Sequence, residues 1–161
     1  MKILITGASG FIGAEIVAKA PGDGYTLLAT SPGLTTLPAL YDKQPFDTLK
    51  DFEPIILASK APYALVVHPS FQARTFKEML EWSRANPGKL TYGSIGAGSS
   101  THLAGEMMAM MAGIEMVHVP FKGSTQTLIE IMGGRIASSF IGLSGVIEQV
   151  KAGQVRPLAV S

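Results

Sequence analysis

Residues 92–106, YGSIGAGSSTHLAGE, run from the end of a strand through a glycine-rich loop into the start of a helix. Strand-like and helix-like patterns alternate on both sides of this segment, which predicts an α/β fold with mostly parallel sheets and flanking helices. In folds of this class, ligands bind where a strand ends and the next helix begins. The segment is therefore the first candidate for a binding site.

Local patterns predict the individual elements. Short apolar runs bounded by glycine, proline or polar residues predict strands at residues 2–6, 25–29, 54–59, 63–68, 90–93, 115–119, 136–140 and 155–160. Helix patterns occur at residues 14–20, 100–112, 124–132 and 144–151, and most clearly in RTFKEMLEWSRANPGK at 74–89. In that last stretch Thr75 and Glu78 have the spacing of a capping box, and the Asn-Pro-Gly sequence at 86–88 ends the helix.

The segment between residues 31 and 54 carries four prolines and no long periodic run. We therefore expect it to be an irregular surface excursion. Strand and helix patterns alternate again beyond Ala61, so a domain boundary is predicted there.

The composition excludes several classes of function. Thirteen Lys and Arg residues nearly balance twelve Asp and Glu, and no block of like charge occurs, so neither nucleic acid nor an anionic membrane surface is an expected partner. The chain has no cysteine, which excludes disulfides, thiolate metal sites and a cysteine nucleophile. No apolar run approaches the roughly 18 residues of a membrane span, and no signal peptide is recognised.

Metal binding and catalysis are not expected either. The three histidines, His68, His102 and His118, are widely spaced, so no metal site is predicted. Catalysis needs a nucleophile with an orienting base, or paired carboxylates in a cleft, whereas the acidic residues here are scattered. We therefore expect a binding protein without a cofactor, not an enzyme.

The N-terminal stretch TGASGFIG, residues 6–13, supports an alternative. Gly7, Gly10 and Gly13 follow an apolar strand and precede a helix, as in a dinucleotide-binding turn. The stretch resembles the start of extended short-chain dehydrogenases and sugar epimerases. However, the predicted second strand ends without the acidic residue that binds ribose, and no tyrosine has the lysine four positions later that this family uses. The alternative to a binding protein is therefore a fragment of an NAD-dependent epimerase or reductase. A third possibility is a gene remnant that has no function of its own.

A second resemblance is much longer. The stretches IGAEIVAKAPGDGYTLLAT (12–30), LPALYDKQPFDTLKDFEPI (37–55), ANPGKLTYGSIGAGSSTHLAGEMM (85–108), VHVPFKGSTQTL (117–128) and VKAGQVRPLAV (150–160) carry it. In their order, they are similar to the Bug family, the extracytoplasmic solute receptors of tripartite tricarboxylate transporters.

This resemblance implies a periplasmic binding protein fold of type II, with residues 1–60 as part of lobe one and residues 61–161 as a complete lobe two. It also implies a truncated periplasmic receptor that delivers a small carboxylic acid to membrane transporter subunits without entering the membrane itself.

The candidate site residues follow from the glycine-rich loop and from this resemblance. Backbone N–H groups and hydroxyls at a helix start can hold a carboxylate, with about 1.5–3 kcal/mol for each charge-assisted hydrogen bond. The first group is Ser94, Gly96, Gly98, Ser99, Ser100, Thr101 and His102, and the second is Gly123 and Ser124 in PFKGSTQT. The resemblance adds Ser31 and Gly33 from lobe one. The other interpretation is that these serines only cap the helices.

The residue at position 141 bears on the kind of acid. Bug family members often have aspartate where Ile141 stands. Since that carboxylate would suit a ligand carrying an amino group, the resemblance implies a plain carboxylic acid.

Overall fold

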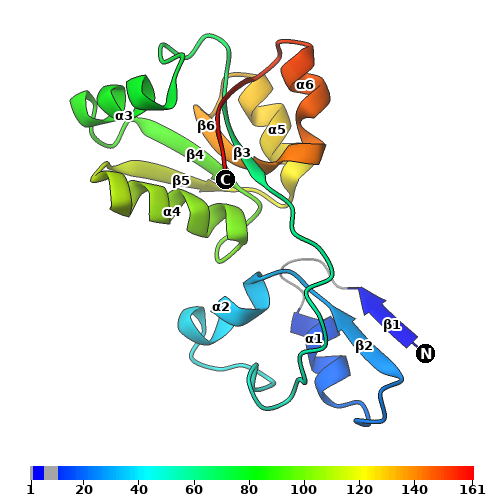
Figure 1. Cartoon of the computed structure of the whole chain (residues 1–161). Coiled ribbons are helices and arrows are strands. Elements are labelled where there is room, and N and C mark those ends of the chain that lie inside the picture. Colours follow the sequence, from blue (N-terminus) through cyan, green and yellow to red (C-terminus); the bar gives the residue numbers. More distant parts are fainter. Residues whose placement is uncertain (1, 6–10) are drawn as a thin grey trace. The chain divides into compact units, whose positions relative to one another are not determined.

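The computed structural model describes residues 2–5 and 11–161, which form two compact units. The larger unit comprises Ser59–Ala97 and Thr101–Ser161, and the smaller unit comprises Met1–Ala58 with Gly98–Ser100. The chain crosses between them in an extended segment without regular structure (Figure 1).

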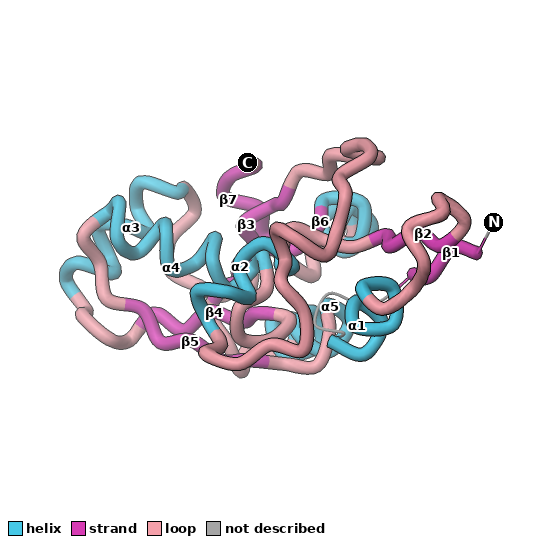
Figure 2. Tube along the Cα trace, turned by 90° about the horizontal axis from the view of Figure 1, so that it is seen from below, coloured by secondary structure: helices cyan, strands magenta, loops and turns pink. Residues whose placement is uncertain are grey.

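The larger unit is built on a five-stranded sheet with the strand order β5-β4-β6-β3-β7. The strands are β3 (Tyr63–Val67), β4 (Leu90–Ser94), β5 (Met116–Pro120), β6 (Ser138–Gly142) and β7 (Arg156–Val160). The strand β4 is parallel to β5 and β6, whereas β3 is antiparallel to β6 and β7. Both views place the C-terminus at the end of β7, beside β3 (Figures 1 and 2).

The sheet is therefore mixed, which differs from the mostly parallel arrangement expected from the alternation of elements. The reason is the position of β3, which lies between β6 and β7 in the sheet and is antiparallel to both. Strand direction depends on these long-range pairings, and local periodicity carries no information about them. The α/β class and the flanking helices are confirmed.

Helices cover both faces of this sheet (Figure 1). They are α3 (Phe76–Ala85), α4 (Ser100–Ala112), α5 (Ser124–Met132) and α6 (Ile147–Lys151), with the short 3-10 helix η1 (Leu143–Gly145) before α6. The predicted cap of α3 is confirmed, because Thr75 Oγ1 accepts a hydrogen bond from the Glu78 N–H at 3.2 Å.

The strand β3 connects the two halves of the core. Ala64 and Val66 pack into a cluster with side chains of α5, while Leu65 and Val67 pack into a second cluster with Met79 of α3. Alternate residues of a strand point to opposite faces, so a strand buried on both faces is apolar throughout. All four residues are no more than 1% exposed, which makes β3 the centre of the unit.

The smaller unit contains the parallel pair β1 (Lys2–Ile5) and β2 (Thr26–Ala29), with the helices α1 (Phe11–Ala18) and α2 (Gly33–Leu40). The helix α2 lies within the segment that was expected to be irregular. That prediction is wrong for residues 33–40, where Leu34 and Leu37 are spaced to share one face of a helical turn. Residues 41–54 contain neither helix nor strand, as expected.

Residues 54–59 were expected to form a strand, and this prediction is also wrong. They have no regular structure, and Ile55, Ile56 and Leu57 are 73%, 82% and 69% exposed. Their composition favours a strand, but a strand also requires a neighbour with which to form hydrogen bonds. Within residues 2–5 and 11–161, no strand pairs with this segment.

No helix among the described residues has both the length and the hydropathy that crossing a membrane requires.

Candidate functional site

The loop between β4 and α4 has a conformation that glycine makes accessible. Gly96 and Gly98 have φ values of +124° and +76°, in a region that residues with side chains rarely adopt. The loop is closed by Thr101, whose Oγ1 accepts a hydrogen bond from the Ile95 N–H at 3.1 Å. Thr101 is only 2% exposed. The sequence therefore specifies both the turn and the group that closes it.

The hydroxyl of Ser94 is directed into the interior. Ser94 is fully buried, and its Oγ lies 2.6 Å from His118 Nε2 and 3.1 Å from both the backbone N and the backbone O of Gly96. Sequence reasoning placed this hydroxyl among the ligand contacts. In the structure it supports the loop and does not line the neighbouring pocket.

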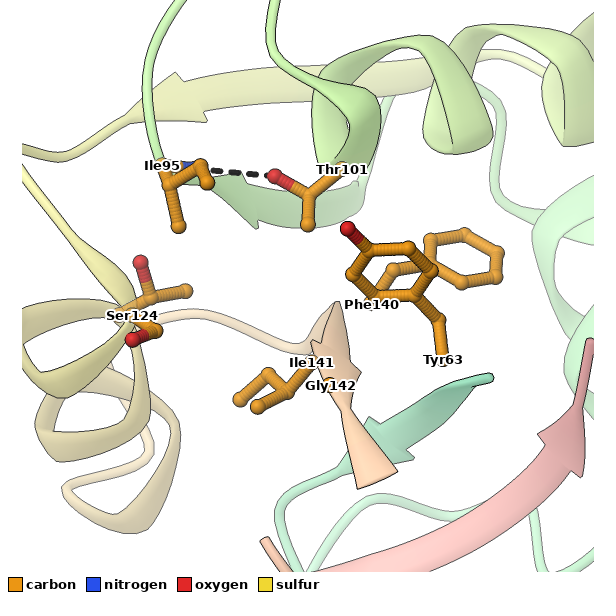
Figure 3. A pocket seen from close by; sticks show the side chains of 8 residues that line it. Tyr63, Ile95, Thr101, Ser124, Phe140, Ile141 and Gly142 are labelled. Atoms are coloured by element: carbon orange, nitrogen blue, oxygen red, sulfur yellow. Dashed lines mark hydrogen bonds between the residues drawn. The ribbon is translucent and has the colours of Figure 1, made fainter. Parts of the chain in front are cut away.

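A pocket of about 210 Å³ opens beside this loop (Figure 3). It is lined by Tyr63, Ile95, Thr101, Ser124, Thr127, Phe140, Ile141 and Gly142, all from the larger unit. The predicted residues Thr101 and Ser124 come from the first turns of α4 and α5, and the structure brings them to one pocket. Strand ends and helix starts meet here, which is the usual place for a ligand in an α/β fold.

The other predicted site residues do not line this pocket. Ser99 and Ser100 precede Thr101 in the chain, and Gly123 is the N-cap of α5 beside Ser124. Ser31 and Gly33 lie at the start of α2 in the smaller unit, where Gly33 is buried. Gly7 and Gly10 lie outside the described residues, while Gly13 is buried within α1.

Several pocket residues were missed by sequence reasoning. Pairing of β3 with β6 places Tyr63 opposite Gly142, with Ile141 and Phe140 next along β6. No local signal in the sequence links Tyr63 to the glycine-rich loop, because the connection is made only by the sheet. From the sequence, Ile141 was noted only because an uncharged residue stands where the Bug family often has aspartate. In the structure, Ile141 lines the pocket.

The pocket has hydroxyl groups and an apolar wall, but no charged side chain. Ile95, Phe140 and Ile141 form the apolar part. Thr127 Oγ1 is directed inward, to the carbonyl oxygens of Gly123 at 3.0 Å and Ser94 at 3.4 Å. An anion bound here would be held by neutral donors and by the positive ends of the helix dipoles.

Beneath the loop lies a cluster of rings. The rings of His102 and His118 stack with centroids 4.0 Å apart, and the His118 ring also stacks on Tyr92 at 5.0 Å. Tyr92 Oη donates to Glu106 Oε1 at 2.5 Å, and His102 Nε2 lies 3.8 Å from the same oxygen. His102, predicted to contact the ligand, belongs to this stack. No group of side chains in the described part of the chain could hold a metal ion.

Burial governs the ionisation of this cluster. It raises the pKa of the Tyr92 phenol, and the Glu106 carboxylate raises that pKa further. Burial also lowers the pKa of His118, as does the charge of the adjacent His102, whereas Glu106 acts in the opposite direction. The His118 side chain is therefore neutral at pH 7, and its Nε2 is hydrogen-bonded with Ser94 Oγ.

This predicts that acid destabilises the chain. The folded-state pKa of His118 is below the unfolded value of about 6.5, so the unfolded chain takes up a proton first as the pH falls. The free energy of unfolding should decrease from about pH 7 downwards and level off once folded His118 is protonated. Urea midpoints measured between about pH 7.5 and pH 5 would show this decrease. His118→Gln should reduce the slope, and an unchanged slope in this variant would contradict the prediction.

Comparison with known proteins gives one consistent result. The model of the tripartite tricarboxylate transporter family receptor matches residues 5–161. A protein encoded in the tcbD-tcbE intergenic region of Pseudomonas sp. (strain P51) is 37% identical over 155 residues, which cover 96% of this chain and 46% of that protein. BugT of Bordetella pertussis is 29% identical over 160 residues, covering 96% and 48%. The chain thus spans about half the length of the curated relatives it matches.

Solved structures agree with this result. R. palustris Rpa4515 with adipate has a TM-score of 0.84 and 35% sequence identity, covering 96% of this chain and 52% of that chain. The periplasmic binding protein BugD has a TM-score of 0.81 and 29% identity, with the same coverage. The match over residues 5–161 gives no support to the dehydrogenase alternative.

Proposed function

Because the chain belongs to the tripartite tricarboxylate transporter receptor family, we propose that it binds a small carboxylate as part of a solute receptor, with no chemical reaction. In this proposal the larger unit is lobe two, the smaller unit is part of lobe one, and the receptor acts in the periplasm. Its partners are the membrane subunits of the transporter, to which it delivers the acid.

The observation that carries the proposal is the pocket at the starts of α4 and α5. The helix α4 has thirteen residues, so its first-turn N–H groups present a substantial partial positive charge. Thr101 and Ser124 add side-chain hydroxyls at the two helix starts. These groups can hold an anion without lysine or arginine, because hydrogen bonds to charged groups are each worth about 1.5–3 kcal/mol.

The apolar wall restricts the ligand class. Ile95, Phe140 and Ile141 offer no partner to an ammonium group, so an amino acid would lose the hydration of that charge without compensation. A plain acid with a short hydrocarbon body fits both parts of the pocket. Adipate, which the related Rpa4515 structure contains, has this chemistry and is the first ligand to test.

We expect weak binding by this chain. A two-lobed receptor encloses its ligand from both sides, whereas one lobe leaves part of the anion in water, where each contact contributes less. The dissociation constant should therefore be no tighter than about 1 mM.

The test is a titration of the isotopically labelled chain with adipate, a panel of other dicarboxylates and aromatic acids, and NADH, followed by NMR chemical shifts. The acids should shift the amide signals of Ile95, Thr101 and Ser124, and NADH should not. Ser124→Ala should weaken binding about tenfold by removing one hydrogen bond to the carboxylate. The control is Thr125→Ala, which alters the exposed neighbour and should bind as the unchanged chain does. Shifts with NADH alone would support a dinucleotide-binding function instead.

A further inference from the structure

His118 of β5 contacts the residue from which the glycine-rich loop starts. The strand β5 is parallel to β4, with His118 opposite Tyr92 and Pro120 opposite Ser94. Side chains alternate between the two faces of a strand, so His118 projects on the face that Tyr92 and Ser94 share. There its Nε2 lies 2.6 Å from Ser94 Oγ. The sheet therefore brings to the loop a ring nitrogen from a distant part of the sequence.

The hydrogen bonds of the Ser94 hydroxyl indicate which nitrogen of His118 carries a hydrogen. Ser94 Oγ contacts His118 Nε2 and also the backbone N and the carbonyl oxygen of Gly96, both at 3.1 Å. A hydroxyl has one hydrogen to donate and two lone pairs with which to accept. It accepts the Gly96 N–H, and when it donates to the Gly96 carbonyl it has one lone pair left. All three contacts are hydrogen bonds only when His118 Nε2 carries a hydrogen and donates it.

Building on the carboxylate-binding function proposed above, we propose that His118 is a positioning residue, whose Nε2–H donates to Ser94 Oγ and thereby holds the Gly96 backbone in the conformation that receives the carboxylate. If the hydroxyl donated to the histidine instead, it could not also donate to the Gly96 carbonyl. His118 does not line the pocket, so it acts on the ligand through Ser94 and the loop.

The Gly96 backbone is a part of the loop that needs such support. Its φ is +124°, a conformation that glycine reaches easily and also leaves easily, because it has no side chain to restrict it. Ile95 lies between Ser94 and Gly96, lines the pocket, and donates its N–H to Thr101 Oγ1 (Figure 3). Holding both neighbours of Ile95 fixes one wall of the pocket before the ligand arrives, so less order has to be imposed on binding.

The imidazole ring is itself held in place. It stacks on Tyr92 with the centroids 5.0 Å apart and on His102 at 4.0 Å. Burial lowers the pKa of His118, and the charge of His102 acts in the same direction, so the ring is neutral at pH 7. A neutral imidazole carries a hydrogen on only one of its two nitrogens. In the proposed arrangement that nitrogen is Nε2, which is a measurable property.

The first test reads the tautomer of the unchanged chain by NMR. In a nitrogen-15-labelled sample at about pH 7.5, above the ordinary pKa of histidine, His118 should have a protonated Nε2 and an unprotonated Nδ1. Its signals are identified by their absence from the spectrum of His118→Gln. A hydrogen on Nδ1 would overturn the inference, because Ser94 would then donate to the histidine and not to Gly96.

The second test measures affinity for adipate by NMR titration. His118→Phe retains a flat ring for stacking but has no donor, whereas the matched control His118→Gln carries a side-chain N–H at a similar distance from the backbone. His118→Phe and Ser94→Ala should each bind adipate about tenfold more weakly, and His118→Gln should retain most of the affinity. The double variant His118→Phe with Ser94→Ala should lose little more than either single variant, because both changes remove the same contact.

The outcomes separate this inference from the proposed function. Equal affinities of His118→Phe and His118→Gln would overturn the role of the donor, and additive losses in the double variant would mean that the two residues act independently. Either result leaves the carboxylate-binding function intact. Failure of the unchanged chain to bind any acid would refute that function, while the tautomer would still report the hydrogen bond to Ser94. Since the tautomer is read from the unchanged chain, the inference can fail even if a variant does not fold.

Discussion

Replacing Gly105 with valine is expected to destabilise the larger unit by about 3 kcal/mol or more, a substantial part of the 5–15 kcal/mol that stabilises a typical domain. Gly105 lies in the middle of α4, where the helix passes over Tyr92 of β4. A Cβ atom at this position would lie 2.2 Å from Tyr92 Cε2 and 2.6 Å from Cδ2, distances at which atoms overlap.

The tyrosine has little freedom to move aside. Tyr92 is 1% exposed, its ring stacks on His118, and its hydroxyl is bound to Glu106 of the same helix. A side chain at Gly105 would therefore separate α4 from the sheet and displace the glycine-rich loop that precedes the helix.

Urea unfolding of Gly105→Val measures this effect. The matched control is Gly145→Val, because Gly145 is exposed and a Cβ there would meet no atom within 4 Å. The control should change the free energy of unfolding by no more than about 0.5 kcal/mol. Combining Gly105→Val with Tyr92→Ala should cost less than the two changes added together, because the second removes the overlap. Unchanged stability of Gly105→Val would contradict the close contact between α4 and β4.

Replacing Thr101 with valine is expected to reduce both stability and ligand binding. Valine has the shape of threonine without the hydroxyl, so the Ile95 N–H would lose its acceptor in a partly buried loop. An unsatisfied buried donor costs about 1–3 kcal/mol. Since the same loop positions the start of α4, affinity for adipate should fall by about tenfold or more.

Hydrogen exchange of the Ile95 amide separates this mechanism from a general loss of stability. That amide should exchange faster in Thr101→Val, while amides in the centre of β3 change only as far as the global stability does. The variant Thr101→Ser retains Oγ and should keep both the slow exchange and most of the affinity. If serine and valine behave alike, the hydroxyl does not close the loop, and the proposed role of Thr101 fails.

The candidate site was predictable in part. Glycine spacing and hydroxyls before a helix pattern identify the loop between β4 and α4, and the same reasoning identifies Ser124 at α5. However, a hydroxyl can face a ligand or the interior, and the local sequence does not distinguish these cases. Ser94 was predicted to face the ligand, but packing of β5 beside β4 brings His118 to it and directs it inward.

The class of fold, most of its elements and the glycine-rich loop could be predicted from local patterns, because strand and helix periodicity, capping and the backbone freedom of glycine depend on near neighbours in the chain. The direction of β3, the absence of a strand at residues 54–59, and the positions of Tyr63 and Ile141 in the pocket could be learned only from the folded chain. Those features depend on which strands pair, and pairing is settled by contacts between residues far apart in sequence.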